Sequence, residues 1–204
     1  MSTGKNQPLT YDYENSSGYS IVAGTDEAGR GPLAGDVYAA AVILPRGLFI
    51  PGLNDSKKVS PGMREKLYDV ITREAVSYAV ATASVDEIDA INILNAAMLA
   101  MRRAVDALNV PPEFVLIDGN CERNFEAIPH ACIISGDAKS PSVAAASILA
   151  KVSRDRYMTA LDAKYPLYGF ASHKGYPTKT HIEAIQNHGA CEVHRRTFLR
   201  KILP

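Results

Sequence analysis

Four acidic side chains in this sequence each follow a short apolar run, the pattern of a strand that ends in a charged residue. A charged group directly after an apolar strand is costly unless it is solvated, paired or bound to a cation. In sheets covered by helices, strand ends are where sites assemble, so residues distant in sequence can converge there. The four are Asp26, Glu27, Asp118 and Asp137.

Clustered carboxylates of this kind suit hard divalent cations, which prefer oxygen ligands. Two such ions about 4 Å apart can activate water and stabilise a leaving oxygen in phosphate chemistry. The simpler alternative is that these acids are solvated turn residues, which an Asp-Gly pair such as Asp118-Gly119 often is. On their own, the carboxylates indicate only a metal site of undefined chemistry.

The segment after the first acidic pair adds a second chemical feature, Gly29-Arg30-Gly31. Glycines allow close backbone approach to a ligand, and amide groups there can bind hydroxyl and phosphate oxygens. Arg30 can make a two-pronged contact with a phosphate. By itself a three-residue pattern of this kind is unspecific.

The segments that must position these residues alternate between strand and helix patterns. Residues 1–20 are polar and predict a flexible tail. Strands followed by alternating strands and helices indicate one α/β domain with a mixed sheet over residues 21–204. Strands are predicted at 21–25, 37–44, 77–85, 114–117 and 131–134, and helices at 95–108, 140–163 and 178–188.

The charge distribution is more informative than the composition, which is ordinary at 47% hydrophobic and 22% charged residues. The net charge of zero argues against indiscriminate coating of nucleic acid. However, residues 1–138 carry 11 basic and 18 acidic residues, whereas residues 139–204 carry 11 and 4. An acidic front with candidate metal ligands and a basic back suit a polyphosphate substrate held beside cations.

Neither a secreted nor a membrane protein is expected from the sequence. The first twenty residues lack an apolar signal region, and no run approaches the roughly 18–20 apolar residues of a membrane span. Cys121, Cys132 and Cys191 show no metal or redox spacing, which favours free thiols. We therefore expect a cytoplasmic protein, and a monomer, since nothing in the sequence indicates an oligomer.

Seven blocks in one order resemble bacterial ribonuclease HII, and the match runs from about Ile21 to Phe198, nearly the whole chain. Such an ordered set makes a chance match very improbable. The blocks are DEAGRGPLAG (26–35), LNDSKK (53–58), NIL…AMLAMRRAV (92–105), VLIDGN (115–120), GDAKSPSVAAASILAKVSRDR (136–156), YGFASHKGYPT (168–178) and HRRTF (194–198).

The resemblance implies a ribonuclease H-like fold, with a mixed five-stranded sheet flanked by helices and a helical C-terminal part. It implies cleavage of the RNA strand of RNA–DNA hybrids by a mechanism that uses two Mg²⁺ or Mn²⁺ ions. It also implies cutting of duplex DNA on the 5′ side of a single embedded ribonucleotide, leaving a 3′-hydroxyl and a 5′-phosphate. The expected partners are thus hybrids and ribonucleotide-containing duplexes.

The resemblance also implies roles for individual residues of this sequence. The four carboxylates match the family's catalytic metal ligands. Gly29, Arg30 and Gly31 match the loop that senses the ribose 2′-hydroxyl, and Tyr176 matches the tyrosine that packs on the sugar at the RNA–DNA junction.

Further basic and polar residues are candidate substrate contacts. For Lys57 and Lys58 the block match favours phosphate contact over a solvated loop. Lys139 and Ser140 lie near a predicted helix start, where anions bind well. Lys174, close to the junction tyrosine, is expected to face nucleic acid.

Two observations stand apart from these assignments. Asp36 occupies a position where the family usually has proline or a small residue, and we expect it to face solvent. His181 and His194 lack ligand spacing of the HExxH kind, so a zinc site is not expected.

Two other functions compete with the junction-cutting nuclease. A metal-dependent phosphatase or exonuclease would use the same carboxylates but gives no role to Gly29–Gly31 or Tyr176. A non-catalytic nucleic-acid-binding module explains the basic C-terminal third but leaves four carboxylates repelling the substrate. Cutting of a duplex with one ribonucleotide, but not of all-DNA duplex, separates the first function from both.

Overall fold

The computed structural model describes residues 9–200 and 202, and its centre is a five-stranded sheet in the order β3-β2-β1-β4-β5. Strand β1 pairs antiparallel with β2 and parallel with β4, so the sheet is mixed, as predicted. The strands are β1 Val22–Ala28, β2 Val37–Ile43, β3 Ser77–Ala83, β4 Phe114–Asp118 and β5 His130–Ile133.

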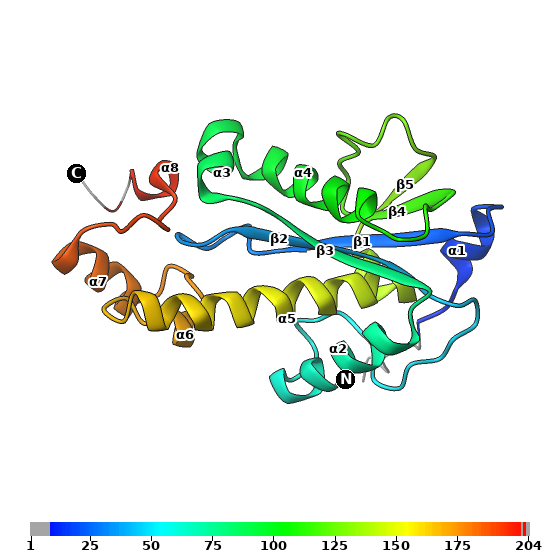
Figure 1. Cartoon of the computed structure of the whole chain (residues 1–204), viewed down its shortest axis with the longest axis horizontal. Helices are drawn as coiled ribbons and strands as arrows, with labels where there is room; N and C mark the ends of the chain where they lie inside the picture. Colours follow the sequence, from blue (N-terminus) through cyan, green and yellow to red (C-terminus); the bar gives the residue numbers. More distant parts are fainter. Residues whose placement is uncertain (1–8, 201, 203–204) are drawn as a thin grey trace, which may run out of the picture.

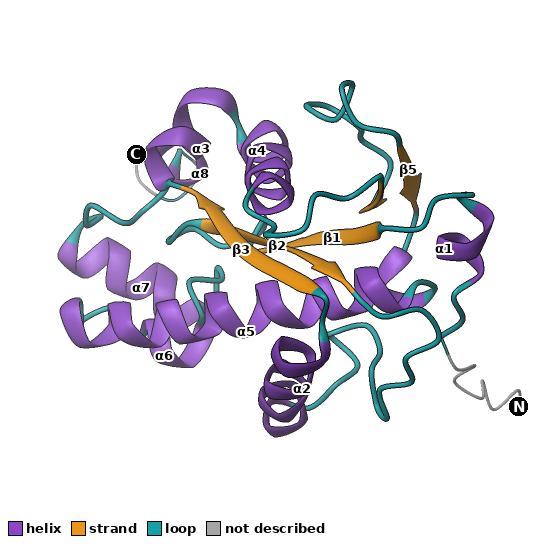
Figure 2. Cartoon of the chain, turned by 45° about the vertical axis from the view of Figure 1, so that its right-hand side comes forward, coloured by secondary structure: helices purple, strands orange, loops and turns teal. Residues whose placement is uncertain are grey.

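Helices cover both faces of this sheet (Figure 1). On one face lie α5 (Pro141–Lys164) and α2 (Pro61–Glu74), and on the other α4 (Ile93–Asp106), which follows α3 (Val85–Ile91). Each interface is an apolar cluster formed between sheet and helices. The turned view in Figure 2 shows the sheet edge-on between these two helical layers.

Close contact between β1 and α5 depends on small side chains. A Cβ placed on Gly24 of β1 would lie 2.3 Å from the backbone of Ser142, so only glycine fits there. The consecutive alanines 144–146 on α5 are fully buried. Because the helix lies this close to β1, its polar residues reach the end of the strand where the first acidic pair lies.

The N-terminus of α5 is capped as the sequence predicts. Ser140 accepts a hydrogen bond from the backbone N–H of Val143, and Pro141 occupies the first helical position. The Ser140 hydroxyl also donates to Glu14 Oε1 at 2.6 Å. Glu14 belongs to the short helix α1, Asp12–Ser16, and is buried.

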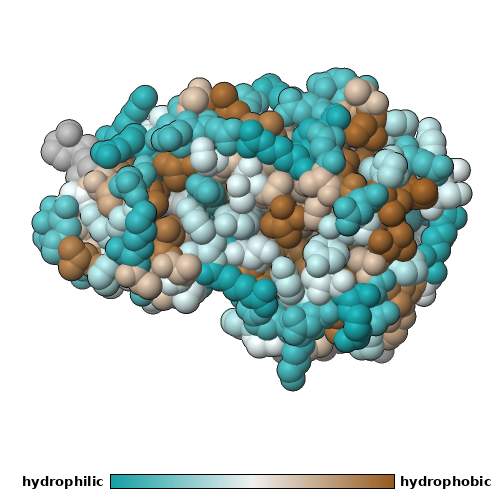
Figure 3. Space-filling view, viewed as in Figure 1, coloured by the Kyte–Doolittle hydropathy of each residue, from teal (hydrophilic) through white to brown (hydrophobic). Residues whose placement is uncertain are grey.

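The C-terminal part is helical, also as expected, and lies at one end of the sheet beside the last turns of α5 (Figure 1). It contains α6 (Phe170–His173), α7 (Lys179–His188) and α8 (Arg196–Leu199), packed around an apolar cluster that includes Phe170 and Ile185. On the face shown in Figure 3, hydrophilic and hydrophobic residues are interspersed over all of these elements.

Two sequence predictions need correction. Strand β1 continues to Ala28, so the acidic pair lies within the strand rather than after it, because pairing with β2 extends to Ala28. The predicted flexible tail over residues 1–20 contains α1, whose buried Glu14 is anchored to the start of α5. Residues 1–8 of that tail lie outside the described residues.

The other predicted strands and helices are confirmed to within a few residues at each end. All three cysteines are free, as expected. No helix among the described residues is long and apolar enough to cross a membrane.

Candidate active site

The parallel pairing of β1 and β4 places two of the predicted carboxylates side by side. In the register of this pair, Thr25 lies opposite Ile117. The next residues are Asp26, within β1, and Asp118, the last residue of β4. They therefore lie side by side on adjacent strands. Figure 1 shows α5 running beneath the sheet that contains these strands.

The third acidic segment is attached to the second by a hydrogen bond. Strand β5 is followed by a 3₁₀ turn, Gly136–Ala138, which contains the buried Asp137. The Gly136 N–H donates to Asp118 Oδ1 at 2.7 Å. This bond places the loop that carries Asp137 next to the end of β4.

Burial and mutual repulsion make the ionised form of these carboxyls unfavourable. Burial raises the pKa of Asp26 well above its usual value, and the charges of Glu27 and Asp118 raise it further. Burial also raises the pKa of Glu27, although Arg30 opposes this from 3.3 Å away. Carboxylates that repel one another in this way bind a cation or a proton readily.

A loop lysine and an additional acid complete the electrostatics. The pKa of Asp137 is raised to about 6, first by burial and then by the charges of Asp55 and Asp118. Lys57 lies among the acids: burial lowers its pKa, but the charges of Asp137, Asp26 and other carboxylates outweigh that effect and raise it overall. Lys57, which was predicted as a phosphate contact, thus lies beside the acidic residues, whereas Asp55 was not singled out from the sequence.

One cavity of about 350 Å³ unites most of the predicted site residues. It is bounded by the ends of β1 and β4, by the loop after β1, and by α5. Of the residues predicted from the sequence, those that line it are Asp26, Glu27, Gly29, Arg30, Gly31, Lys57, Asp118 and Tyr176.

The loop after β1 is shaped by two arginines that the sequence gave no reason to single out. Gly29 has a positive φ of 103°, and a Cβ there would lie 2.0 Å from Nε of Arg154. Arg154, on α5, is 1% exposed and donates to the carbonyls of Ala34, Asp36 and Lys174. Glycine is required at position 29 by this contact as well as by its backbone conformation.

Arg195 holds the same loop from the other side. Its guanidinium is fully buried and donates hydrogen bonds of 2.7–3.1 Å to four backbone carbonyls. The accepting residues are Gly29, Arg30, Pro32 and Gly35. In the sequence Arg195 was counted with the basic C-terminal third, but its charge is directed into the protein.

Tyr176 faces the loop across the cavity. A Cβ added to Gly31 would lie 3.5 Å from Cε1 of the Tyr176 ring, which is ordinary contact distance. Tyr176 is 41% exposed, which is unusual for a large aromatic residue. One side of the ring lies against the protein and the rest is open to solvent. The resemblance predicted both residues in one site, and the structure brings them together.

Four predicted substrate contacts lie outside this cavity: Lys58, Lys139, Ser140 and Lys174. Ser140 is buried and committed to the α5 cap and Glu14, so the prediction of a substrate contact by its side chain is not supported. Lys139 is exposed and donates to the carbonyl of Ile134. Lys174 donates to Thr159 and Ala171 and lines a neighbouring cavity along α5.

Asp36 does not face solvent, contrary to expectation. It is half-buried, and its Oδ1 accepts a hydrogen bond from the backbone N–H of Val85, the first residue of α3. An acid at a helix N-terminus is favourable because the N–H groups there lack partners within the helix. The unusual residue therefore anchors α3 to the loop after β1.

The donor chemistry of the acidic residues fits a hard divalent cation, but the side chains are not gathered into a ligand shell. Within residues 9–200 and 202, no three His, Cys, Asp or Glu side chains lie close enough to hold a metal ion. Local bonds direct the carboxylates: Asp26 Oδ1 accepts from the Glu27 N–H at 2.7 Å, and Glu27 pairs with Arg30. The repulsion that raises the pKa of Asp26 and Asp137 nevertheless favours binding of such a cation beside them.

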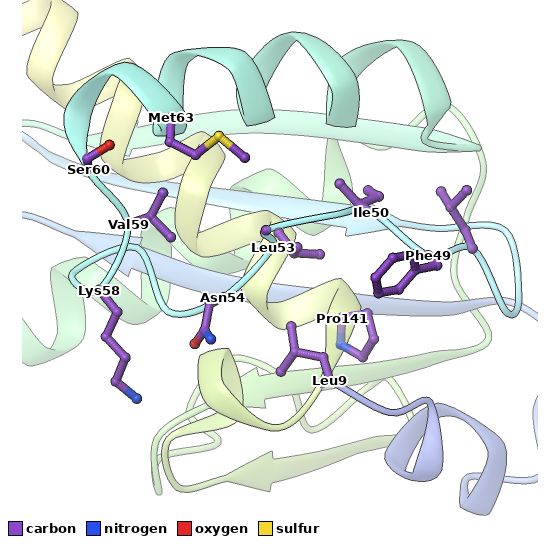
Figure 4. Close-up of a pocket in the computed structure, with 12 residues that line it drawn as sticks. Leu9, Phe49, Ile50, Leu53, Asn54, Lys58, Val59, Ser60, Met63 and Pro141 are labelled. Atoms are coloured by element: carbon purple, nitrogen blue, oxygen red, sulfur yellow. The ribbon is translucent and has the colours of Figure 1, made fainter. Parts of the chain in front are cut away.

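A second cavity, of about 420 Å³, has a different character (Figure 4). It lies between the loop after β2 and the start of α2, and its lining is largely apolar, with Phe49, Leu53 and Met63 among the labelled side chains. Lys58 borders it, so the two lysines of the LNDSKK block point to different cavities. None of the four predicted metal ligands lines it.

Comparisons with known proteins agree with the fold and identify the family. The family model described as ribonuclease HII matches residues 23–201. Ribonuclease HII of Caldicellulosiruptor bescii is 53% identical over 186 residues, covering 91% of this chain and 90% of the relative. The ribonuclease H2 structure from Pyrococcus horikoshii OT3 superposes with a TM-score of 0.74 at 30% identity, covering 90% and 97% of the two chains.

A more distant structure shares the fold alone. Bst-RNase HIII, solved in complex with Mn²⁺, has a TM-score of 0.63 at 19% identity and covers 92% of this chain and 68% of that one. The family match extends over the acidic strand ends, the glycine loop and the C-terminal segment that holds it. The chain therefore belongs to the ribonuclease HII family, endoribonucleases that cleave the RNA strand of RNA–DNA hybrids.

Proposed function

We propose that this enzyme also cuts duplex DNA on the 5′ side of a single embedded ribonucleotide, leaving a 3′-hydroxyl and a 5′-phosphate. The observation that carries the proposal is the arrangement of Tyr176 and Gly31, which face each other across a cavity that also contains Asp26, Glu27 and Asp118. A sugar held between ring and loop would lie next to the acidic residues. Recognition and hydrolysis can then occur on adjacent nucleotides.

In this proposal the loop Gly29–Gly31 reads the ribose 2′-hydroxyl. Its carbonyls are bound to Arg195, which leaves the shape of the loop independent of the substrate. A rigid polar site rejects an analogue that lacks the expected hydroxyl, because its own polar groups then lose their partner. Deoxyribose would be disfavoured for that reason.

Asp26, Glu27, Asp118 and Asp137 are proposed to hold two Mg²⁺ or Mn²⁺ ions. Bound ions would supply a nucleophilic water near neutral pH and charge stabilisation for the leaving oxygen. The protein's contribution is a set of neighbouring carboxylates in which burial and repulsion raise the pKa of Asp26 and Asp137, and bound cations would offset that repulsion. Lys57, beside Asp137 and Asp26, is placed to contact a phosphate oxygen of the strand that is cut.

The test is single-turnover cleavage of three labelled substrates in Mg²⁺: all-DNA duplex, duplex with one ribonucleotide, and a long RNA–DNA hybrid. We expect the last two to be cut and the first to remain intact. Tyr176→Ala should slow cutting at the single ribonucleotide by at least about tenfold while the long hybrid is affected less. Mn²⁺ should replace Mg²⁺, but Ca²⁺ should not, because its longer and looser coordination misplaces the reacting oxygens.

An unchanged rate of Y176A on the single-ribonucleotide duplex would contradict the junction-sensing role and leave only a hybrid nuclease. Cutting of all-DNA duplex by the parent protein would contradict the role of Gly29–Gly31. Robust cleavage in Ca²⁺ alone would argue against the proposed metal requirement.

A further inference from the structure

A chain of hydrogen bonds through two buried histidines ends on the backbone of Tyr176. Nδ1 of His181 lies 2.9 Å from the Tyr176 carbonyl oxygen, and its Nε2 lies 3.1 Å from Nε2 of His194. Nδ1 of His194 in turn lies 3.0 Å from the backbone nitrogen of Cys191. His181 and His194 are 0% and 1% exposed, and neither has a part in the proposed chemistry.

The groups at the two ends of the chain determine where its protons lie. The Cys191 N–H can only donate, so Nδ1 of His194 must accept, and the proton of the neutral ring is on Nε2. The Tyr176 carbonyl can only accept, so Nδ1 of His181 carries the proton and its Nε2 accepts from His194. All three bonds are satisfied by one tautomer of each ring.

The surroundings keep both rings neutral. Burial, and secondly the neighbouring His181, lower the pKa of His194 to about 4. Burial likewise lowers the pKa of His181. The ring of Phe170 packs edge-on against His181 at a centroid distance of 5.5 Å, so an additional proton there would meet apolar surface as well as a second N–H.

The same short segment that ends this chain also holds the loop opposite Tyr176. His194 forms an isolated bridge with Ala34, and the Arg195 N–H donates to the Leu33 carbonyl at 2.8 Å. Arg195 binds the carbonyls of Gly29 and Arg30. Two consecutive residues therefore fix both sides of the cavity, one through His181 and one directly.

We propose that His181 and His194 are positioning residues that set the gap between the Tyr176 ring and Gly31, and through it the selectivity for a ribonucleotide at a junction. The proposal rests on the role of Tyr176 given above. Neither histidine lines the cavity or touches the reacting atoms. Their effect is on where the carbonyl of Tyr176, and hence its ring, is held.

Two substitutions at one position separate positioning from packing. The amide nitrogen of Asn lies as many bonds from the backbone as Nδ1 of His and can donate as Nδ1 does. The amide oxygen of Gln lies as many bonds from the backbone as Nε2 of His and can accept as Nε2 does. His181→Asn can therefore keep the hydrogen bond to the Tyr176 carbonyl while losing the one to His194. His181→Gln can keep the hydrogen bond to His194 while losing the one to the Tyr176 carbonyl.

The experiment measures single-turnover rate and substrate half-saturation for the parent protein, H181N, H181Q and Y176A. The substrates are a duplex with one ribonucleotide and a long hybrid. We expect H181Q to lose about tenfold in the rate on the single ribonucleotide, with half-saturation and the long-hybrid rate within about threefold of the parent. H181N should stay within about threefold of the parent on both substrates.

Equal rates for H181N and H181Q on the single ribonucleotide, or equal losses on both substrates, would overturn the positioning role. A parent-like rate for Y176A would instead contradict the proposed function, and the selectivity role of the histidines with it. Should H181Q not fold, ¹⁵N NMR of the imidazoles in the parent protein provides the test. His194 should be protonated at Nε2 and His181 at Nδ1 at pH 7, and any other pair of tautomers would overturn the proposal.

Discussion

Two regions of this molecule bury ionisable side chains, and they treat charge in opposite ways. At the ends of β1 and β4, Asp26 and Glu27 lie beside Asp118 with too few positive partners, and their pKa values are raised by burial and by repulsion from neighbouring carboxylates. Around the loop after β1, Arg154 of α5 and Arg195 are as deeply buried, but their guanidinium groups donate to backbone carbonyls. The carboxyls have too few positive partners, whereas the two guanidinium groups are hydrogen-bonded to carbonyls even though burial lowers their pKa values.

The difference shows which region is built for a ligand and which for shape. A buried charge with all its hydrogen bonds satisfied fixes the backbone around it but has nothing left to offer a substrate. Buried charges that repel one another lower the stability of the empty protein and attract whatever neutralises them. In this protein the two buried arginines hold the loop that borders the acidic residues.

The largest expected effect comes from removing the hydrogen bonds of the buried Arg195. Arg195→Ala would leave four buried carbonyls without their donor and open a cavity, which should lower the free energy of unfolding by about 3–5 kcal/mol. The adjacent Arg196→Ala is the matched control, because that side chain is exposed, and should change it by less than about 0.5 kcal/mol. Chemical denaturation measures both, and similar losses in the two variants would contradict the scaffold role of Arg195.

Removing one negative charge from the acidic residues should abolish cleavage without lowering the stability of the fold. Asp118→Asn can still accept from the Gly136 N–H, but it no longer raises the pKa of Asp26 and Glu27. We expect cleavage to fall by more than about a hundredfold, since a metal ligand is lost. In chelator, the variant should be equally stable or up to about 1 kcal/mol more stable than the parent. A well-folded D118N protein with near-normal turnover would contradict the metal site.

The smallest effect, and the most direct comparison of the two regions, is in the dependence of stability on pH. The pKa of Asp137 is raised to about 6, so the folded protein binds its proton more readily than the unfolded chain, and this group favours folding as the pH falls below about 6. The pKa of His194 is lowered to about 4, so the unfolded chain takes up that proton first, and this group disfavours folding between about pH 6.5 and 4.

Asp137→Asn removes only the first of these opposing contributions. In chelator, its free energy of unfolding should therefore drop more steeply than that of the parent between pH 6.5 and 4, by on the order of 2 kcal/mol across the window. Denaturation curves at several pH values measure the slope. If the free energy of unfolding changes equally with pH in parent and variant, the pKa of Asp137 is not raised in the folded protein.

Much of the site was predictable because its residues are chemically unusual where they stand. Acids after apolar runs and a glycine pair around an arginine are visible in a single sequence, and the mixed sheet follows from the alternation of strand and helix patterns. The resemblance added Tyr176, which no local pattern would have selected. The cavity in the structure contains all of these except Asp137.

What could not be predicted depends on where long side chains point. Arg195 and Arg196 are neighbours of the same type, yet one is buried and the other exposed. Ser140 fitted both a helix cap and a phosphate contact, and only its contact with Glu14, 126 residues away, shows that it is enclosed. Asp36 was expected to face solvent because its partner, the start of α3, is 49 residues further along the chain.

The bond between Arg195 and the Gly29 carbonyl also bears on how the protein is made. The two residues are 166 positions apart, so the loop is synthesised long before the side chain that fixes it. At ribosomal rates of about 5–20 residues per second, that interval is on the order of ten to thirty seconds. During this time the acidic residues of β1 have already been synthesised, but Tyr176 and Arg195 have not both been added. The loop therefore takes its final shape opposite Tyr176 only after Arg195 has been synthesised.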